Sequence, residues 1–270
     1  MRKNKYFSLS LMLEGIKQTK TLGICLTVVS IIVSCFNPFI TLFSPLGASF
    51  HAVTVNEFVA PIFSMSYFIP AILIFGLFGF MNKRNSSDFY HSVPLNRSCV
   101  YITYTAVTMV WCIFIMLVST FASYLLCVIA PSVMITPYFI WIALYSSFIA
   151  AFLSMSIALV AMGLSGNFFS DIVTFLLLMF APRLIISVFT SAISSAVPIV
   201  SFDSIPLLRP YINILFIPFE SGVSYSELMT DWGIMLYSII LALVYFVRGF
   251  FIHRARKSES AESAVAFKGV

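Results

Sequence analysis

Six long apolar stretches constrain this chain more than any other feature. They cover residues 21–43, 58–81, 99–130, 138–164, 171–197 and 232–252. A helix of about 20 apolar residues crosses the hydrocarbon core of a bilayer, and the stretches lack the alternating pattern of membrane β-strands. Apolar residues make up 60% of the chain and charged residues 9%, which excludes a water-soluble globule. The sequence therefore predicts an all-α, polytopic membrane protein with six transmembrane helices in a single membrane domain, residues 1–270.

The basic residues predict the orientation of these spans. If the amino terminus is cytoplasmic, all of the 15 Lys and Arg residues except Arg183 and Arg209 fall on the cytoplasmic side. Such an excess of positive charge marks the cytoplasmic loops of membrane proteins. We expect a multi-pass protein of the plasma membrane with both termini in the cytoplasm. The net charge of +5 follows from this arrangement and gives no reason to expect a nucleic-acid partner.

The amino-terminal segment, residues 1–20, has the pattern of an amphipathic helix. Leu9, Met12, Leu13 and Ile16 follow at i, i+3, i+4 and i+7 and form one apolar stripe. The pattern predicts a helix that lies in the inner headgroup layer. The alternative is that this segment simply extends the first span into the cytoplasm.

The segment before the last span, residues 198–231, is broken by Pro206, Pro210 and Pro218. It is too apolar for a solvated loop, and its prolines disrupt a straight helix. We therefore expect a broken outer segment, with short re-entrant helices that dip into the membrane from outside.

Few residues could support catalysis or bind a cofactor. Residues 163–166 spell G-x-S-G, but His51, His91 and His253 are poorly placed to activate Ser165, so that we interpret Ser165 as a turn residue. There is no H-E-x-x-H motif and no phosphate-binding loop. The five cysteines show no C-x-x-C spacing and are typical of core residues. The sequence predicts no catalytic, cofactor-binding or metal-binding residue.

Arg183 is the lone ionisable residue well inside a predicted span. It follows Pro182 and lies 12 residues beyond Asp171, roughly 18 Å along a helix. It is a candidate pathway residue that attracts an anionic group. The favoured alternative is an arginine that reaches the interface or pairs with a polar group where the proline breaks the helix, since no complementary acid can be named.

The connection between the second and third spans, residues 82–98, reads NKRNSSDFYHSVPLNRS and is the most polar internal segment. Pro94 ends a predicted short helix, on which Phe89, Tyr90 and Val93 share one side. Two explanations remain for the exposed rings. They either anchor the loop at the lipid interface or form a docking surface for another protein.

The run RNSSDFYHSVPLNR, residues 84–97, resembles the cytoplasmic loop of permease subunits from type-2 ATP-binding-cassette (ABC) transporters of Gram-positive bacteria. In those subunits a similar [RK]-x-S-x-D-F/Y-h-S-x-P-x-x-R stretch precedes the third span. The plan of six spans, an amphipathic amino-terminal helix and a broken outer segment also agrees over almost the whole chain.

The resemblance implies that this loop holds a coupling helix that docks on a separate ABC ATPase. It assigns the contact to a set of loop residues and two flanking charges, namely Ser87, Asp88, Phe89, Tyr90, His91, Arg84 and Arg97. The chain would then be the permease subunit of an exporter, without enzymatic activity of its own, in a dimer with itself or a second permease. The ATPase would bind ATP and Mg. The alternative is a membrane accessory or immunity protein without a transport role.

The carboxyl-terminal run RARKSESAESAVAF, residues 254–267, resembles a segment that is followed in longer members by a large external domain and further spans. Under this resemblance the chain is either a compact member or the first half of a longer permease.

Overall fold

The computed structural model of the chain describes residues 7–43, 55–82, 96–129, 137–196, 215 and 231–256. Its elements are α1 (Leu9–Phe43), α2 (Val55–Phe78), η1 (Gly79–Asn82), α4 (Arg97–Ile129), α5 (Pro137–Leu164), α6 (Phe168–Ala196) and α8 (Trp232–Ala255). The described residues contain no strand. The prediction of an all-α protein is confirmed.

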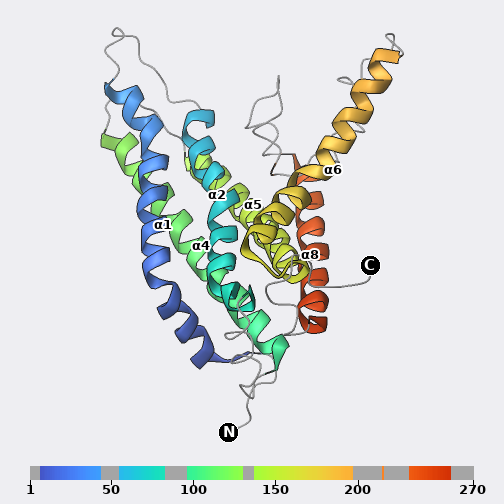
Figure 1. Cartoon of the computed structure of the whole chain (residues 1–270). Helices are drawn as coiled ribbons and strands as arrows, with labels where there is room; N and C mark the ends of the chain where they lie inside the picture. Colours follow the sequence, from blue (N-terminus) through green and yellow to red (C-terminus); the bar gives the residue numbers. More distant parts are fainter. Residues whose placement is uncertain are drawn as a thin grey trace.

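Five of the described helices are long and apolar enough to cross a membrane: α1, α2, α4, α5 and α8. α6 contains a shorter apolar helical segment, Phe168–Ala181. A multi-pass membrane protein is therefore supported, whereas the count of six spans stays a prediction. The carboxyl-terminal half of α6 leaves the bundle (Figure 1) and exposes Leu184, Ile185, Val188 and Phe189.

α2 and α5 occupy the centre of the bundle. Their apolar segments are 72% and 78% buried, against 24% for α1, 39% for α4 and 28% for α8. α1 and α4 flank the centre on one side, and α6 and α8 on the other (Figure 1). α5 suits a central position because Ala150, Ala158 and Ala161 are fully buried, and small side chains let neighbouring helices approach closely. The outer helices leave apolar faces exposed, as expected of helices in contact with lipid.

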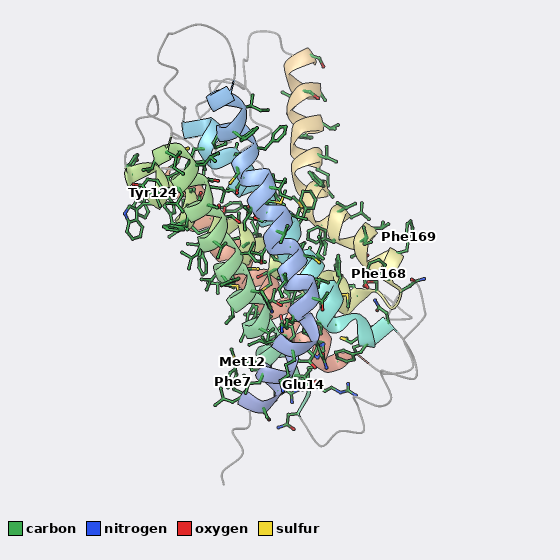
Figure 2. All side chains as sticks on the ribbon, turned by 90° about the vertical axis from the view of Figure 1, so that its left-hand side faces the viewer. Phe7, Met12, Glu14, Tyr124, Phe168 and Phe169 are labelled. Carbon is green, nitrogen blue, oxygen red and sulfur yellow. The ribbon has the colours of Figure 1, made fainter. Side chains whose placement is uncertain are left out.

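A glycine on α1 allows this helix to pack closely against α4. A Cβ atom on Gly23 would lie 2.7 Å from the ring of Trp111, so that only glycine leaves room for the indole. The indole Nε1 of Trp111 donates a hydrogen bond of 2.9 Å to Thr19 Oγ1. α1 and α4 therefore run side by side in the same direction (Figure 2).

The amino-terminal segment forms one continuous helix with the first span. Met12 and Ile16 pack against the core, while Leu9 and Leu13 are exposed. This arrangement matches the second expectation for residues 1–20, a helix that extends the first span. A helix that lies in the inner headgroup layer stays a prediction. Of the expected re-entrant segment, only residues 215 and 231 belong to the described part of the chain.

Candidate functional site

A buried carboxylate, that of Asp171, forms the centre of a polar cluster where several helices end. Asp171 lies in the first turn of α6 and is 0% exposed. Ser165, in the turn between α5 and α6, donates to its Oδ1, and Asn82, the last residue of η1, donates through Nδ2 to its Oδ2. The positive end of the α6 dipole also favours this charge. Asp171 thus joins α2, through η1, to α5 and α6.

Arg256 is a second buried charge of this cluster and interacts electrostatically with Asp171. Arg256 follows the last turn of α8 and is 3% exposed. Its Nη1 donates to the carbonyl oxygen of Met162 and its Nη2 to that of Met81, at 3.0 Å for the second bond. Burial lowers the pKa of Arg256, and the negative charge of Asp171 raises it. Arg256 therefore fixes the end of α8 to the ends of α5 and α2.

Arg97, the first residue of α4, completes the cluster. Its Nη1 donates to the carbonyl oxygens of Arg256, at 2.5 Å, and of Arg254, at 3.4 Å. A cation is favourable at these last carbonyl groups of α8, because they carry the negative end of the helix dipole. We call Asn82, Arg97, Ser165, Asp171 and Arg256 the polar junction.

Aromatic rings support the polar junction from the core side. The ring of His253 lies 5.6 Å from that of Phe78 and 5.4 Å from that of Tyr101, between centroids. Tyr101 is 1% exposed, and its hydroxyl donates to the carbonyl oxygen of Phe246 at 2.9 Å. The ends of α2, α4 and α8 are thus held by packing as well as by charge.

Two glycines let α8 approach its neighbours at this end of the bundle. A Cβ atom on Gly163 would lie 2.6 Å from Ile252 Cγ2, and one on Gly249 would lie 2.9 Å from the hydroxyl of Tyr101. Both distances are shorter than real Cβ contacts allow. The polar junction therefore lies in a closely packed region where an added methyl group requires neighbouring atoms to move.

The polar junction frames the predicted coupling loop. Asn82 is the first residue of this loop, residues 82–98, and Arg97 is the last but one. Asn82 contacts α6 through Asp171, and Arg97 contacts the end of α8. Both ends of the loop are therefore hydrogen-bonded to one cluster that joins five helices.

Most of the residues expected to contact an ATPase lie outside the described part of the chain. These are Arg84, Ser87, Asp88, Phe89, Tyr90 and His91. Arg97 is described and belongs to the polar junction. Arg183 lies within α6, but its side chain is also outside the description. The roles assigned to these residues stay predictions.

Ser165 is a turn residue, as expected, and it has a structural partner. Its hydroxyl lies 2.8 Å from the carbonyl oxygen of Ala161 and also contacts Asp171. Within the described ranges no group of three His, Cys, Asp or Glu side chains could hold a metal ion. None of the five cysteines forms a disulfide, and Cys99, Cys112 and Cys127 are buried.

Sequence reasoning missed the polar junction as a site. Asp171 marked only the start of an apolar stretch, and Arg256 was one of several basic residues after the last span. The signal available in the sequence was that charged or polar residues stand at the ends of successive apolar stretches. Each of them was used only to predict the orientation of the spans. No protein-family model and no curated protein sequence matches the chain.

Proposed function

We propose that this chain is the transmembrane permease subunit of an ABC transporter, most simply an exporter. In this proposal the spans number six and both termini are cytoplasmic. The coupling loop, residues 82–98, contacts a separate ATPase, which binds ATP and Mg and supplies the hydrolysis. The contact residues are Arg84, Ser87, Asp88, Phe89, Tyr90, His91 and Arg97. The permease forms a dimer with itself or with a second permease. The chain has no catalytic residue in this scheme.

The observation that carries the proposal is the connection of the loop to the polar junction. A loop that transmits movement from an ATPase needs firm attachment to the spans that must move. Asn82 and Arg97 provide this attachment at the two ends of the loop, through Asp171 and the end of α8. A loop that only anchored the chain at the lipid interface would not need such attachment at both ends.

The charges of the polar junction also suit a transmission element. Buried charges are stable only while they are paired and hydrogen-bonded, so that α2, α5, α6 and α8 are expected to move together at this end. A displacement of the loop then changes the positions of several helices at once. This is the behaviour expected of a switch between two packed arrangements of a bundle.

Copurification with an ATPase tests the proposal. The full chain, with an affinity tag, is expressed together with the ABC ATPase from the neighbouring reading frame and purified in mild detergent. We expect the ATPase to copurify. Replacing Asp88 and Phe89 by alanine should reduce its recovery about tenfold, a loss of roughly 1.4 kcal/mol of binding free energy.

A matched control uses the same two residue types elsewhere in the chain. Phe202 and Asp203 also form a Phe and Asp pair, in the predicted outer segment. Replacing this pair by alanine should leave ATPase recovery unchanged. Absence of the ATPase from the unmodified preparation would overturn the proposal and favour the accessory or immunity protein. Equal recovery with all variants would overturn the role of the loop.

A further inference from the structure

Two arginines lie on the exposed side of α8, near its carboxyl-terminal end. Arg248 and Arg254 are both exposed, and Phe251, midway between them along the chain, is 60% exposed. Residues three apart are neighbours on the surface of a helix. The three side chains therefore follow one another along a single ridge. We call Arg248, Phe251 and Arg254 the basic ridge.

The basic ridge has no acidic partner in the described part of the chain. Neither guanidinium forms a hydrogen bond or an ion pair with another described residue. The sequences of α4, α5 and α8 contain no Asp or Glu. The only acid of α6 is Asp171, which is fully buried and bonded to Ser165 and Asn82. The described residues around α8 thus leave the two positive charges of the ridge uncompensated.

An apolar surface runs along the same side of α8 up to the basic ridge. From Leu236 to Val247 this surface extends about 17 Å, at the rise of an α-helix, which is close to the depth of one leaflet of the hydrocarbon core. Val247 directly precedes Arg248. The exposed side of α8 therefore combines an apolar length of one leaflet with a cationic end. Its exposed apolar side chains are Leu236, Ile240, Leu243, Val244 and Val247.

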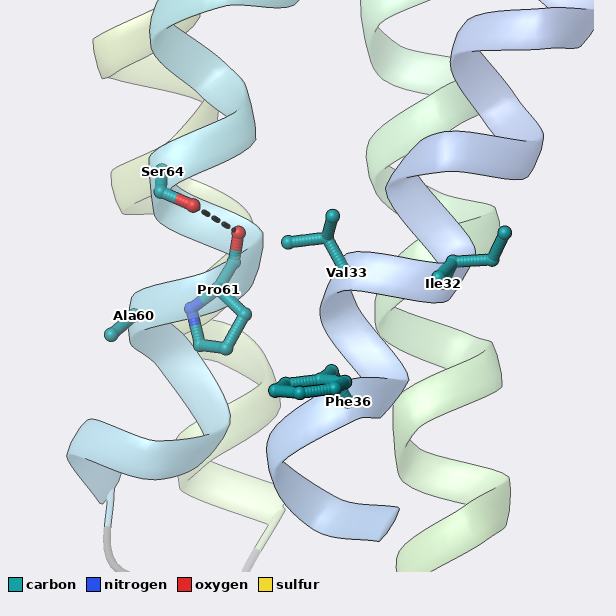
Figure 3. A pocket seen from close by; sticks show the side chains of 6 residues that line it. All are labelled: Ile32, Val33, Phe36, Ala60, Pro61 and Ser64. Carbon is teal, nitrogen blue, oxygen red and sulfur yellow. Dashed lines mark hydrogen bonds between the residues drawn. The ribbon is translucent and has the colours of Figure 1, made fainter. Parts of the chain in front are cut away.

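An open groove between α1 and α2 provides a contrast, because it is apolar but has no basic residue. In Figure 3 the side chains of Val33 and Phe36 point toward α2. The hydroxyl of Ser64 donates to the carbonyl oxygen of Pro61 at 2.8 Å. The groove thus offers contact to an acyl chain without attracting an anionic headgroup. Its volume is about 360 Å³, and its lining residues are Ile32, Val33, Phe36, Ala60, Pro61 and Ser64.

We propose that the basic ridge binds the headgroup of an anionic phospholipid whose acyl chains lie along the apolar surface of α8. A guanidinium suits this role because it donates paired hydrogen bonds to phosphate oxygens. Basic residues at the membrane surface also attract anionic lipids. A lipid is favoured over an acidic protein segment because an amphiphile covers the ridge and the adjoining apolar surface together. The inference requires only that α8 lies in a bilayer and is independent of the proposed function.

Paired photolabelling with two lipids tests this binding. The full chain is reconstituted in vesicles of phosphatidylethanolamine and phosphatidylcholine that contain a trace of phosphatidylglycerol or phosphatidylcholine with the same diazirine-labelled acyl chain. After digestion with chymotrypsin, mass spectrometry compares the adducts on residues 243–251 with those on the groove, residues 32–36 and 60–64. We expect the ratio of phosphatidylglycerol to phosphatidylcholine adducts to be about tenfold higher on α8 than in the groove. Equal ratios would overturn the proposal.

Removing the two positive charges should abolish this preference. Arg248→Gln with Arg254→Gln should lower the ratio on α8 about tenfold, equivalent to about 1.4 kcal/mol. Arg248→Lys with Arg254→Lys keeps both charges and should keep most of the preference. Lys17→Gln with Lys20→Gln removes two exposed cations of α1 instead and should leave the labelling of α8 unchanged. An unchanged ratio in the glutamine variant, an equal decrease in the α1 control or a loss of preference in the lysine variant would overturn the proposal.

The acidic tail of the chain is the competing occupant of the basic ridge. Glu259 and Glu262 are the acidic residues nearest to Arg254 along the chain. If they neutralised the ridge, Glu259→Gln with Glu262→Gln would raise the labelling of α8 by phosphatidylglycerol. We expect no change in this variant, and a severalfold increase would overturn the proposal in favour of the tail. ATPase copurification, measured separately, reports on the proposed function.

Discussion

The two buried polar groups of this bundle differ in how their atoms are partnered. In the polar junction, Asp171 accepts hydrogen bonds from two other elements and Arg256 donates to two backbone carbonyl groups. The hydroxyls of Thr120, Ser123 and Ser147 are buried to a similar degree but have no partner among the described residues. The charged groups of the polar junction are thus hydrogen-bonded, whereas these three hydroxyls have no partner in the described part of the chain.

This difference indicates which group has a fixed arrangement. A buried charge that loses its partner is strongly destabilising, so that the polar junction is expected to hold one geometry at a time. A hydroxyl can rotate and bond to its own helix at little cost. The buried hydroxyls therefore do not hold one arrangement as firmly as the polar junction does.

The largest expected effect comes from removing the buried cation. Arg256→Met keeps an unbranched stem but lacks the guanidinium, so that it leaves Asp171 without this opposite charge and two carbonyl groups without a donor. We expect a loss of about 3–5 kcal/mol in the free energy of unfolding, measured by reversible unfolding in mixed detergent micelles. Arg254→Met, on the exposed side of the same helix end, should change it by less than about 0.5 kcal/mol. Equal losses would show that the polar junction does not hold this end together.

A double-mutant cycle should show that the two charges act as a pair. Asp171→Asn alone leaves Arg256 buried without an opposite charge, while Asp171→Asn with Arg256→Met removes both charges. The combined loss should be smaller than the sum of the single losses by about 1–3 kcal/mol. The matched cycle of Asp171→Asn with Arg254→Met should be additive within about 0.5 kcal/mol. Additivity in both cycles would contradict the pairing.

An added methyl group beside the polar junction should lower the free energy of unfolding more than one in a position with open space. Gly163→Ala forces Ile252 to move, because the new Cβ would lie 2.6 Å from its Cγ2. We expect a net loss of about 1–2 kcal/mol, since overpacking costs more than the helix propensity of alanine restores. Gly79→Ala is the control, because no atom lies within 4 Å of its added Cβ. A loss at Gly79 as large as at Gly163 would contradict close packing as the cause.

The sequence predicts the helices well because their signal is local. Each apolar stretch is long and continuous, and α2, α4, α5 and α8 begin or end within a few residues of the predicted limits. At the amino terminus the same pattern allowed two arrangements. Leu9, Met12, Leu13 and Ile16 form an apolar stripe in both, and the choice depends on whether Met12 and Ile16 find a protein neighbour, as they do here.

The polar junction is not visible in the sequence because its members are far apart along the chain. Asn82 and Asp171 are separated by 89 residues, and Arg256 and Met81 by 175. Nothing in the local pattern of Arg256 distinguishes it from Arg254, yet one is buried and the other exposed. The partners of the buried arginine are backbone carbonyl groups of Met81 and Met162, which no residue-type pattern reveals.

The smallest expected effect distinguishes the two kinds of buried hydroxyl directly. Ser147 and Ser154 are both 0% exposed on α5, but only Ser154 donates to another helix, at Tyr67. Ser154→Ala should therefore cost about 0.5–1.5 kcal/mol in the free energy of unfolding. Ser147→Ala should cost nothing or stabilise the protein by a few tenths of a kcal/mol, since it removes a buried hydroxyl without a partner. Equal losses would mean that Ser147 is bonded within the bundle, and the contrast between the two buried groups would then be one of charge alone.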